Sequence, residues 1–347
     1  MARIVLGIGA SHTPMLTLTS EQWAHRAKVD YANAELNMSD GRLLSYEDIL
    51  AEVGPRYADV VTPEILDRKA QACSDALDRL GDALAAAAPD VVVIVGDDQR
   101  ELFTAANQPA ISVFHGEAIA TSDKYGDEDV ADWVRDMGRG YLMDDLHVVP
   151  GASAFALELI TGLMDENFDI ATAACVDDPK TAGFGHAYGF IIKRLFRGRE
   201  IPIVPLLLNT YYGPNVPSAA RCHDLGLALG RVIARSPSAL RVAVAASGGL
   251  SHFVVDEKLD RQVLDAFTTG NHAALRDIPR GALNSGSSEI LNWIVMAGAV
   301  ASLPLDWQDY QPLYRTPAGT GVGAAFAVWR EDRTRTGSAT TSEDTRC

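Results

Sequence analysis

Short apolar runs alternate with longer amphipathic segments along most of the chain. Six runs have the length of strands and are almost continuously apolar, at residues 3–8, 90–95, 110–114, 169–176, 202–209 and 240–247. Because strands covered on both faces show little polar alternation, these runs are typical of central strands in a buried sheet. Their alternation with helical segments favours an α/β layer architecture.

Three segments have the apolar spacing of helices, at residues 62–89, 256–271 and 288–300. The first begins with Thr62 as an N-cap candidate and Pro63 in the first turn, and Pro89 ends it. Together with the strand-like runs, these helices predict one α/β domain in which a mixed central sheet is covered by helices.

The predicted domain covers residues 1–330, and two stretches differ from the rest of the chain. Residues 20–60 are polar and irregular, which indicates an insertion or lid with some helix. Residues 331–347 are poor in apolar side chains, and we predict that they form a disordered tail.

Charge and cysteine content narrow the function classes. The 347 residues carry 30 Lys and Arg against 46 Asp and Glu, a net charge of −16, which argues against nucleic acid or an anionic membrane surface as a partner. No apolar run reaches the roughly 18 residues of a membrane span, and the N-terminus lacks the features of a secretory signal. The four cysteines have no paired spacing, so we expect reduced thiols and a cytoplasmic protein.

Three histidines lie at places where catalytic groups collect in open α/β sheets. His12 follows the first run in GIGASHTPML, His252 follows the run at 240–247 in SGGLSHF, and His186 lies among small residues in GFGHAYGF. A single histidine after a strand is more often a hydrogen-bonded loop residue than a ligand, but three beside glycines favour a functional site. Glu289, at the start of the last predicted helix, is a fourth candidate, against the alternative that it only complements the helix dipole.

The motifs GIGASHTPML, SGGLSHF and SGSSEILNWIVMAGAV, in this order, resemble the class III extradiol ring-cleavage dioxygenases, the superfamily of the protocatechuate 4,5-dioxygenase catalytic subunit. VVIVGDDQRELF and TSEQW are more similar to its 3-O-methylgallate dioxygenase-like branch. The resemblance runs to about Trp329, interrupted at residues 20–60. It implies a single domain of that type, which opens the ring of a small catecholic or gallate-type acid, such as 3-O-methylgallate or protocatechuate, with O2 at a non-haem Fe(II).

The resemblance also implies residue roles. His12 and Glu289 match two metal ligands of the family, His252 matches its acid/base histidine, and His186 matches a histidine that faces the substrate. A histidine that titrates near neutral pH is suited to accept a proton from the bound diol and to return it later.

A further histidine ligand is expected after the second strand, and Gln99 stands in its place in the triplet Asp97, Asp98 and Gln99. A Gln carbonyl oxygen can coordinate a divalent ion, but it is a poorer donor than imidazole. Asp98, or His115 after the following strand, could coordinate instead. The alternative is that the triplet only caps a turn and that no metal binds.

Carboxylated substrates would need donors or a cation in the pocket. His115 and the segment LLLNTYYGPNVPSAARC provide candidate substrate-binding residues: Asn209, Thr210, Tyr211 and Tyr212, with Arg221 further along. Loop packing is the alternative role for the tyrosines.

The absence of the expected histidine keeps two other classes of protein open. One is a non-redox metal-dependent hydrolase or metal-binding protein on the same scaffold, and the other is an interaction protein without metal. His12, His186, His252 and Glu289 together favour catalysis over a pure scaffold. By resemblance we expect a homodimer, in which residues 20–60 cover the site in place of a small partner subunit.

Overall fold

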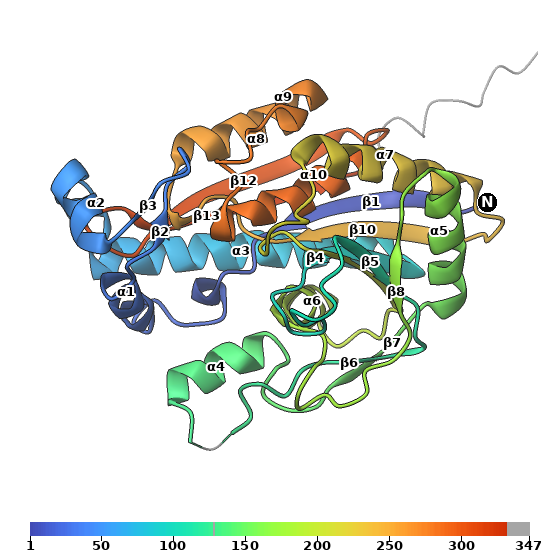
Figure 1. Ribbon diagram of the computed structural model, residues 1–347, viewed down its shortest axis with the longest axis horizontal. Coiled ribbons are helices and arrows are strands. Elements are labelled where there is room, and N and C mark those ends of the chain that lie inside the picture. Colours follow the sequence, from blue (N-terminus) through green and yellow to red (C-terminus); the bar gives the residue numbers. More distant parts are fainter. Residues whose placement is uncertain (128, 332–347) are drawn as a thin grey trace, which may run out of the picture.

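A mixed β-sheet runs through the computed structural model (Figure 1), which describes residues 1–127 and 129–331. Within these residues the sheet has nine strands in the order β11-β13-β1-β10-β4-β9-β5-β8, and β12 also pairs with β13. The strands are β1 (Arg3–Ala10), β4 (Val91–Asp97), β5 (Ile111–Phe114), β8 (Ala171–Ala173), β9 (Ile203–Leu208), β10 (Arg241–Ser247), β11 (His252–Val254), β12 (Leu305–Tyr314) and β13 (Thr320–Trp329).

Parallel and antiparallel pairs both occur in this sheet. β1, β10, β4 and β9 are parallel neighbours, whereas β13 pairs antiparallel with β1 and β5 pairs antiparallel with β9. The predicted single α/β domain with a mixed central sheet is therefore confirmed. Most of the predicted tail, from residue 332 on, lies outside the described residues.

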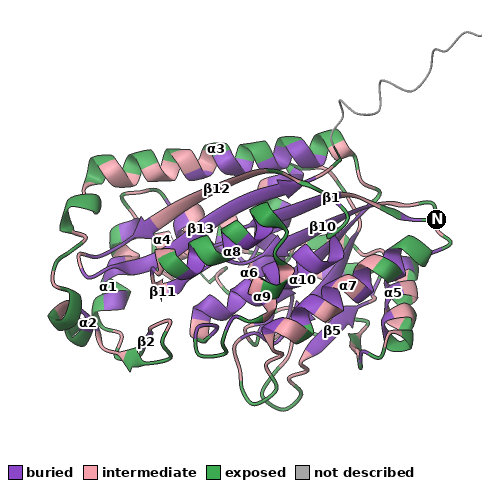
Figure 2. Cartoon of the chain, turned by 90° about the horizontal axis from the view of Figure 1, so that it is seen from above, coloured by how far each residue is buried: buried purple, intermediate pink, exposed green. Residues whose placement is uncertain are grey.

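Helices cover both faces of the sheet (Figures 1 and 2). They are α1 (Trp23–Tyr31), α2 (Tyr46–Val53), α3 (Pro63–Ala87), α4 (Asp132–Gly140), α5 (Ser153–Asp165), α6 (His186–Ile191), α7 (Ala219–Arg235), α8 (Glu257–Thr269), α9 (His272–Arg276) and α10 (Ile290–Ala299). Alternate residues of a strand point to opposite faces, so Val91, Val93 and Val95 of β4 pack in the core with α5, α7 and α10. Val92 and Ile94 pack in the second core with α3 and α6. None of the described helices is both long and apolar enough to cross a membrane.

Helix α10 is buried along its whole length and lies directly on β1. A Cβ atom at Gly9 would lie 2.0 Å from the ring of Trp293, so only glycine permits this close approach. The indole nitrogen of Trp293 donates a hydrogen bond to the carbonyl of Gly248, at 2.6 Å. The helix begins two residues later than predicted, because a 3-10 turn, Ser285–Glu289, precedes it. Glu289 therefore lies where this turn meets the core helix.

Residues 20–60 form α1, α2 and the hairpin β2 (Leu36–Asn37) and β3 (Leu43–Leu44), which lie together near one end of the sheet (Figure 1). Asp30 of α1 accepts hydrogen bonds from Nε and Nη2 of Arg315, at 2.7 and 3.0 Å, and from the hydroxyl of Thr320, at 2.7 Å. The Asp30 and Arg315 side chains are both only 2% exposed. This buried ion pair fixes the segment to the β12–β13 hairpin, and its proposed role as a lid stays a prediction.

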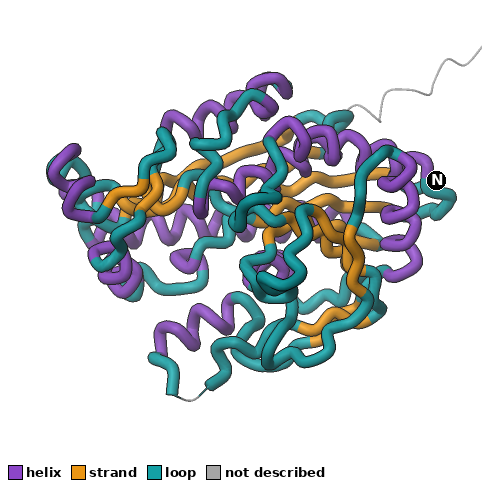
Figure 3. Tube along the Cα trace, viewed as in Figure 1, coloured by secondary structure: helices purple, strands orange, loops and turns teal. Residues whose placement is uncertain are grey.

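The chain between β5 and α6 is mostly loop (Figure 3). Its regular elements are α4, α5, β8 and a small sheet of β6 (Ala118–Ala120) and β7 (Val148–Pro150). Loops of this kind carry side chains that a rigid sheet holds in place, and this one contributes Lys124, Tyr125 and Tyr141 to the pocket described next.

Candidate metal centre and pocket

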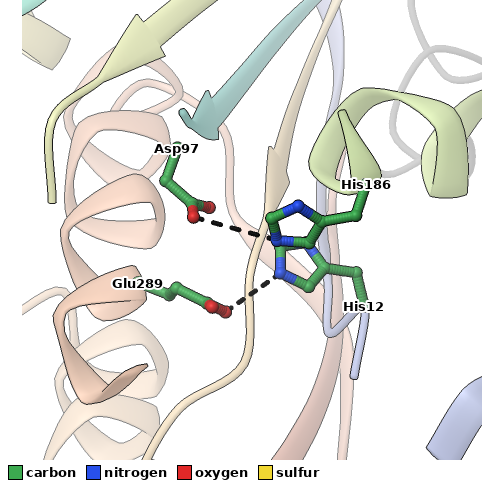
Figure 4. Close-up of side chains that lie close together, drawn as sticks. All are labelled: His12, Asp97, His186 and Glu289. Carbon is green, nitrogen blue, oxygen red and sulfur yellow. Dashed lines mark ion pairs between the residues drawn. The ribbon is translucent and has the colours of Figure 1, made fainter. Parts of the chain in front are cut away.

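Four side chains that could hold a metal ion meet at the carboxyl edge of the parallel strands. His12 follows β1, Asp97 ends β4, Glu289 precedes α10 and His186 begins α6. Figure 4 shows these side chains converging, and their possible ligand atoms lie within 4.8 Å of one another. His12, Asp97 and Glu289 are at most 3% exposed. Parallel strands bring their carboxyl ends to one edge, which explains how residues so distant in sequence come together.

The orientation of His12 is fixed by a hydroxyl group. Ser247 at the end of β10 donates its hydroxyl hydrogen to the carbonyl of Ala187, at 2.6 Å. It must therefore accept from Nδ1 of His12, at 2.9 Å. Nε2 is the ring nitrogen of His12 that faces the group, and it lies 3.1 Å from Oε2 of Glu289. A buried imidazole whose Nδ1 is held by a hydrogen bond presents Nε2 in a fixed direction to a metal ion.

His186 is oriented by a carboxylate that the sequence analysis did not single out. Nδ1 of His186 lies 2.8 Å from Oε1 of Glu101, which can only accept, and Nε2 lies 3.9 Å from Oδ2 of Asp97. A Cβ atom at Gly185 would lie 1.7 Å from Oε2 of Glu101, so this glycine leaves room for the carboxylate. Burial disfavours the imidazolium, but the carboxylates of Glu101, Asp97 and Glu289 outweigh it and raise the pKa of His186 to about 10.

His252 also turns Nε2 toward the group. Its Nδ1 donates to the carbonyl of Leu250, at 2.9 Å, and its Nε2 lies 3.8 Å from Oε2 of Glu289. Burial is the main cause that lowers the pKa of His252 below its usual value. The side chain is therefore neutral near pH 7, with an electron pair on Nε2 that can accept a proton.

The two carboxylates of the group lie close enough to repel each other. Burial, and next the charge of Glu289, raise the pKa of Asp97. For Glu289, burial opposes ionisation, but the charges of His12 and His252 lower the pKa to about 2. A divalent cation between the carboxylates would remove the repulsion, and the imidazole of His12 with these two carboxylates is a suitable donor set for a transition metal. The residues present therefore fit a metal ion.

Gln99 contacts both of these carboxylates through its amide nitrogen. Nε2 donates to Oδ2 of Asp97, at 3.0 Å, and to Oε1 of Glu289, at 3.4 Å. The reverse orientation of the amide would place its oxygen against two carboxylates, which is unfavourable. In this arrangement Gln99 holds the carboxylates, and the hypothesis that it is itself a ligand stays a prediction.

Comparison with known proteins places the chain in a family. Residues 57–326 match the family described as the catalytic LigB subunit of aromatic ring-opening dioxygenase. The chain belongs to this family. Over 204 residues it is 28% identical to the gallate dioxygenase of Pseudomonas putida (strain KT2440), a match that covers 54% of this chain and 56% of that enzyme. The chain thus spans little more than half the length of this relative. The superfamily and the gallate-like branch expected from the motifs are confirmed.

In this family member, Asp98 does not belong to the four-residue group. Its carboxylate accepts from the backbone amides of Glu101, Leu102 and Phe103, at 3.3, 2.8 and 3.2 Å. These bonds close the turn after β4, and burial is the main cause that raises the pKa of Asp98 to about 6. The carboxylate acts as the cap of the turn that presents Gln99 and Glu101.

Asp98→Asn should lower the stability of the protein without impairing metal binding by the four-residue group. The amide can accept from two of the backbone donors but places its own N–H groups near the third, which costs about 1–3 kcal/mol of unfolding free energy. Chemical unfolding and metal analysis of the same samples measure both effects. Asp59→Ala, on an exposed residue, is the control. Loss of metal at unchanged stability would instead identify Asp98 as a ligand.

Most of the predicted substrate-binding residues do not line the cavity in front of the metal group. This cavity has a volume of about 240 Å³, and its described lining does not include His115, Asn209, Thr210 or Tyr212. The side-chain amide of Asn209 donates to the carbonyl of Tyr212, at 2.6 Å, and the backbone N–H of His115 pairs with β8. Their roles in substrate binding remain untested predictions, whereas Tyr211 does line the cavity.

Several lining residues were not anticipated from the sequence. They are Arg26, Glu101, Lys124, Tyr125 and Tyr141, besides Asp97 in the metal group. The hydroxyl of Tyr141 donates to the backbone carbonyl of His12, at 2.6 Å, so the loop between β5 and α6 supports the turn after β1. For Asp97 a signal existed, since it continues the alternation of Val91, Val93 and Val95 toward the α10 face.

Proposed function

We propose that this family member is an extradiol dioxygenase that uses O2 and a non-haem Fe(II) to open the ring of a catecholic or gallate-type acid, for example 3-O-methylgallate or protocatechuate. The observation that carries the proposal is the buried group of His12, Asp97, His186 and Glu289 beside a cavity of about 240 Å³. Its likeness to a gallate dioxygenase supports the substrate class.

In this proposal His12, Asp97 and Glu289 hold the metal. The usual ligand set of two histidines and one carboxylate is changed at one position, where Asp97 takes the place of an imidazole. Fe(II), when bound, would bring the diol and O2 to one centre. Three fixed contacts prepare the ligands: Ser247 orients His12, Asn292 donates to Oδ1 of Asp97 at 3.1 Å, and the backbone amide of Gly249 donates to Oε2 of Glu289 at 2.7 Å. Such outer contacts orient ligands before the metal arrives.

The other two histidines serve the substrate in this proposal. His252 accepts a proton from a substrate hydroxyl at Nε2, because its Nδ1 hydrogen is committed to the carbonyl of Leu250. His186, held from behind by Glu101, faces the same cavity and hydrogen-bonds a substrate oxygen on which negative charge develops.

The test is metal analysis of anaerobically purified protein, followed by O2 uptake after reconstitution with Fe(II). We expect about one Fe(II) per chain, because the described residues provide one donor group. We also expect O2 uptake that depends on 3-O-methylgallate, protocatechuate or gallate. Protein loaded with Zn(II) is the control and should consume no O2. Metal binding without O2 uptake on any of these acids would favour the hydrolase or metal-binding alternative, and absence of metal binding would favour the interaction protein. The expected homodimer and cytoplasmic location stand as predictions beside this proposal.

A further inference from the structure

The cavity contains a cation without an anionic partner. Arg26 of α1 contributes to the cavity lining. Its Nε is buried and makes no hydrogen bond, and no ion pair links Arg26 to another residue in the described part of the chain. Desolvation is the main cause that lowers the pKa of this guanidinium. A partly buried charge of this kind is costly unless something pairs with it.

The nearest carboxylate along the helix cannot fill this role. Asp30 lies one helical turn after Arg26, but both of its carboxylate oxygens already accept from Arg315, and one also accepts from Thr320. The buried Asp30–Arg315 pair is neutral as a unit. Arg26 therefore adds one uncompensated positive charge beside the cavity.

A second cation and several aromatic rings surround the same space. Lys124 lines the cavity, and its Nζ lies 5.5 Å from the centroid of the Tyr125 ring. Tyr141 and Phe253 add apolar ring surface to the lining. The acidic lining residues are already engaged, since Glu101 contacts His186 and Glu289 belongs to the metal group. The free charges of the lining are thus positive, although the whole chain is acidic.

We propose that Arg26, with Lys124 as a second cation, binds the carboxylate of the aromatic substrate and makes the enzyme prefer acids to uncharged catechols. This inference rests on the proposed function and adds a specificity-determining residue to it. A guanidinium fits a carboxylate through two parallel hydrogen bonds, and the aromatic rings suit the ring that carries the acid group. Helix α1, in the segment 20–60, thereby takes part in substrate recognition.

The test compares an acid with its neutral amide. Protocatechuate and 3,4-dihydroxybenzamide share the diol, so anaerobic calorimetry on the Fe(II) protein isolates the contribution of the acid group. Arg26→Met should weaken protocatechuate binding roughly 10- to 100-fold, as expected for loss of a charged hydrogen bond, and change amide binding by less than about twofold. Arg26→Lys should recover part of the affinity. Lys28→Met removes a charge from the same helix at an exposed position and is the matched control.

Separate readouts distinguish this inference from the proposed function. Thermal unfolding of Arg26→Met should show no loss of stability, because the variant removes a partly buried cation that has no partner. Equal losses for acid and amide, or a wild type that binds both equally well, would overturn the role of Arg26. If the wild type opens no ring but prefers the acid, and Arg26→Met abolishes that preference, the anion site stands and the proposed function falls.

Discussion

Asp97→Asn is expected to weaken Fe(II) binding by at least about 100-fold, more than the loss of a residue that only supports a ligand, and to remove ring-opening activity with it. The substitution keeps the shape of the side chain but removes one of the two negative charges that face the metal position. It also replaces an acceptor of the Gln99 and Asn292 amides by a group that is partly a donor. Chelator competition under anaerobic conditions measures the affinity independently of turnover.

The adjacent Asp98→Asn is the matched control, because it makes the same chemical change at a carboxylate that faces backbone amides. Gln99→Ala tests whether Gln99 supports the ligand Asp97 or is itself the ligand. It should reduce metal affinity by roughly 10- to 100-fold, the range for loss of an outer contact. If Gln99→Ala abolishes metal binding and Asp97→Asn leaves it intact, Gln99 is the ligand and the assignment of Asp97 is wrong.

His252→Gln is expected to lower kcat by about 10²- to 10⁴-fold, the usual contribution of a positioned acid/base group. Glutamine retains a hydrogen-bonding group of similar reach, but it cannot take up a proton at neutral pH. Metal content and KM should change little, because His252 is not among the proposed metal ligands and its Nε2 lies 3.8 Å from Oε2 of Glu289. Single-turnover kinetics with reconstituted protein measures the chemical step directly.

His115→Gln provides the comparison for this variant, since His115 is half-buried and is absent from the described cavity lining. Wild-type activity in this variant would argue against the predicted role of His115 in substrate binding, and a loss of activity would support that role. A His252→Gln protein that loses its iron would place His252 among the metal ligands, and one with full kcat would remove it from the chemistry.

The central strands were predictable because both of their faces are covered. Every residue of β4 is buried, so its sequence is a plain apolar run. β12 and β13 were not predicted, although each has ten residues. β13 is built largely from glycine and alanine, and β12 mixes polar and aromatic residues with a proline, so neither has a strong local signal. The pairing of β13 with β1 joins distant parts of the chain, and β12 is held in the sheet only through β13.

The candidate site was predictable where local sequence marks the end of an element. His12, His252 and Glu289 stand beside glycine-rich or serine-rich turns at such ends. Asp97 has the same kind of position and continues the alternation of β4, but no local pattern indicates that α10 packs across this end of the strand. The lack of an anionic partner for Arg26 depends on the ion pair between Asp30 and Arg315, which are 285 positions apart. Long-range contacts of this kind lie beyond arguments from periodicity and capping.

The ion pair between Asp30 and Arg315 joins the segment 20–60 to the sheet at a place that is separate from the metal group. The metal group is carried by β1, β4, α6 and the start of α10, which belong to the core. Arg26 is carried by a peripheral segment that is joined to the sheet at a hairpin. Peripheral segments accept substitutions more readily than a core does. If Arg26 binds the acid group as proposed, substitutions in α1 can change the preferred acid while the metal group keeps its geometry.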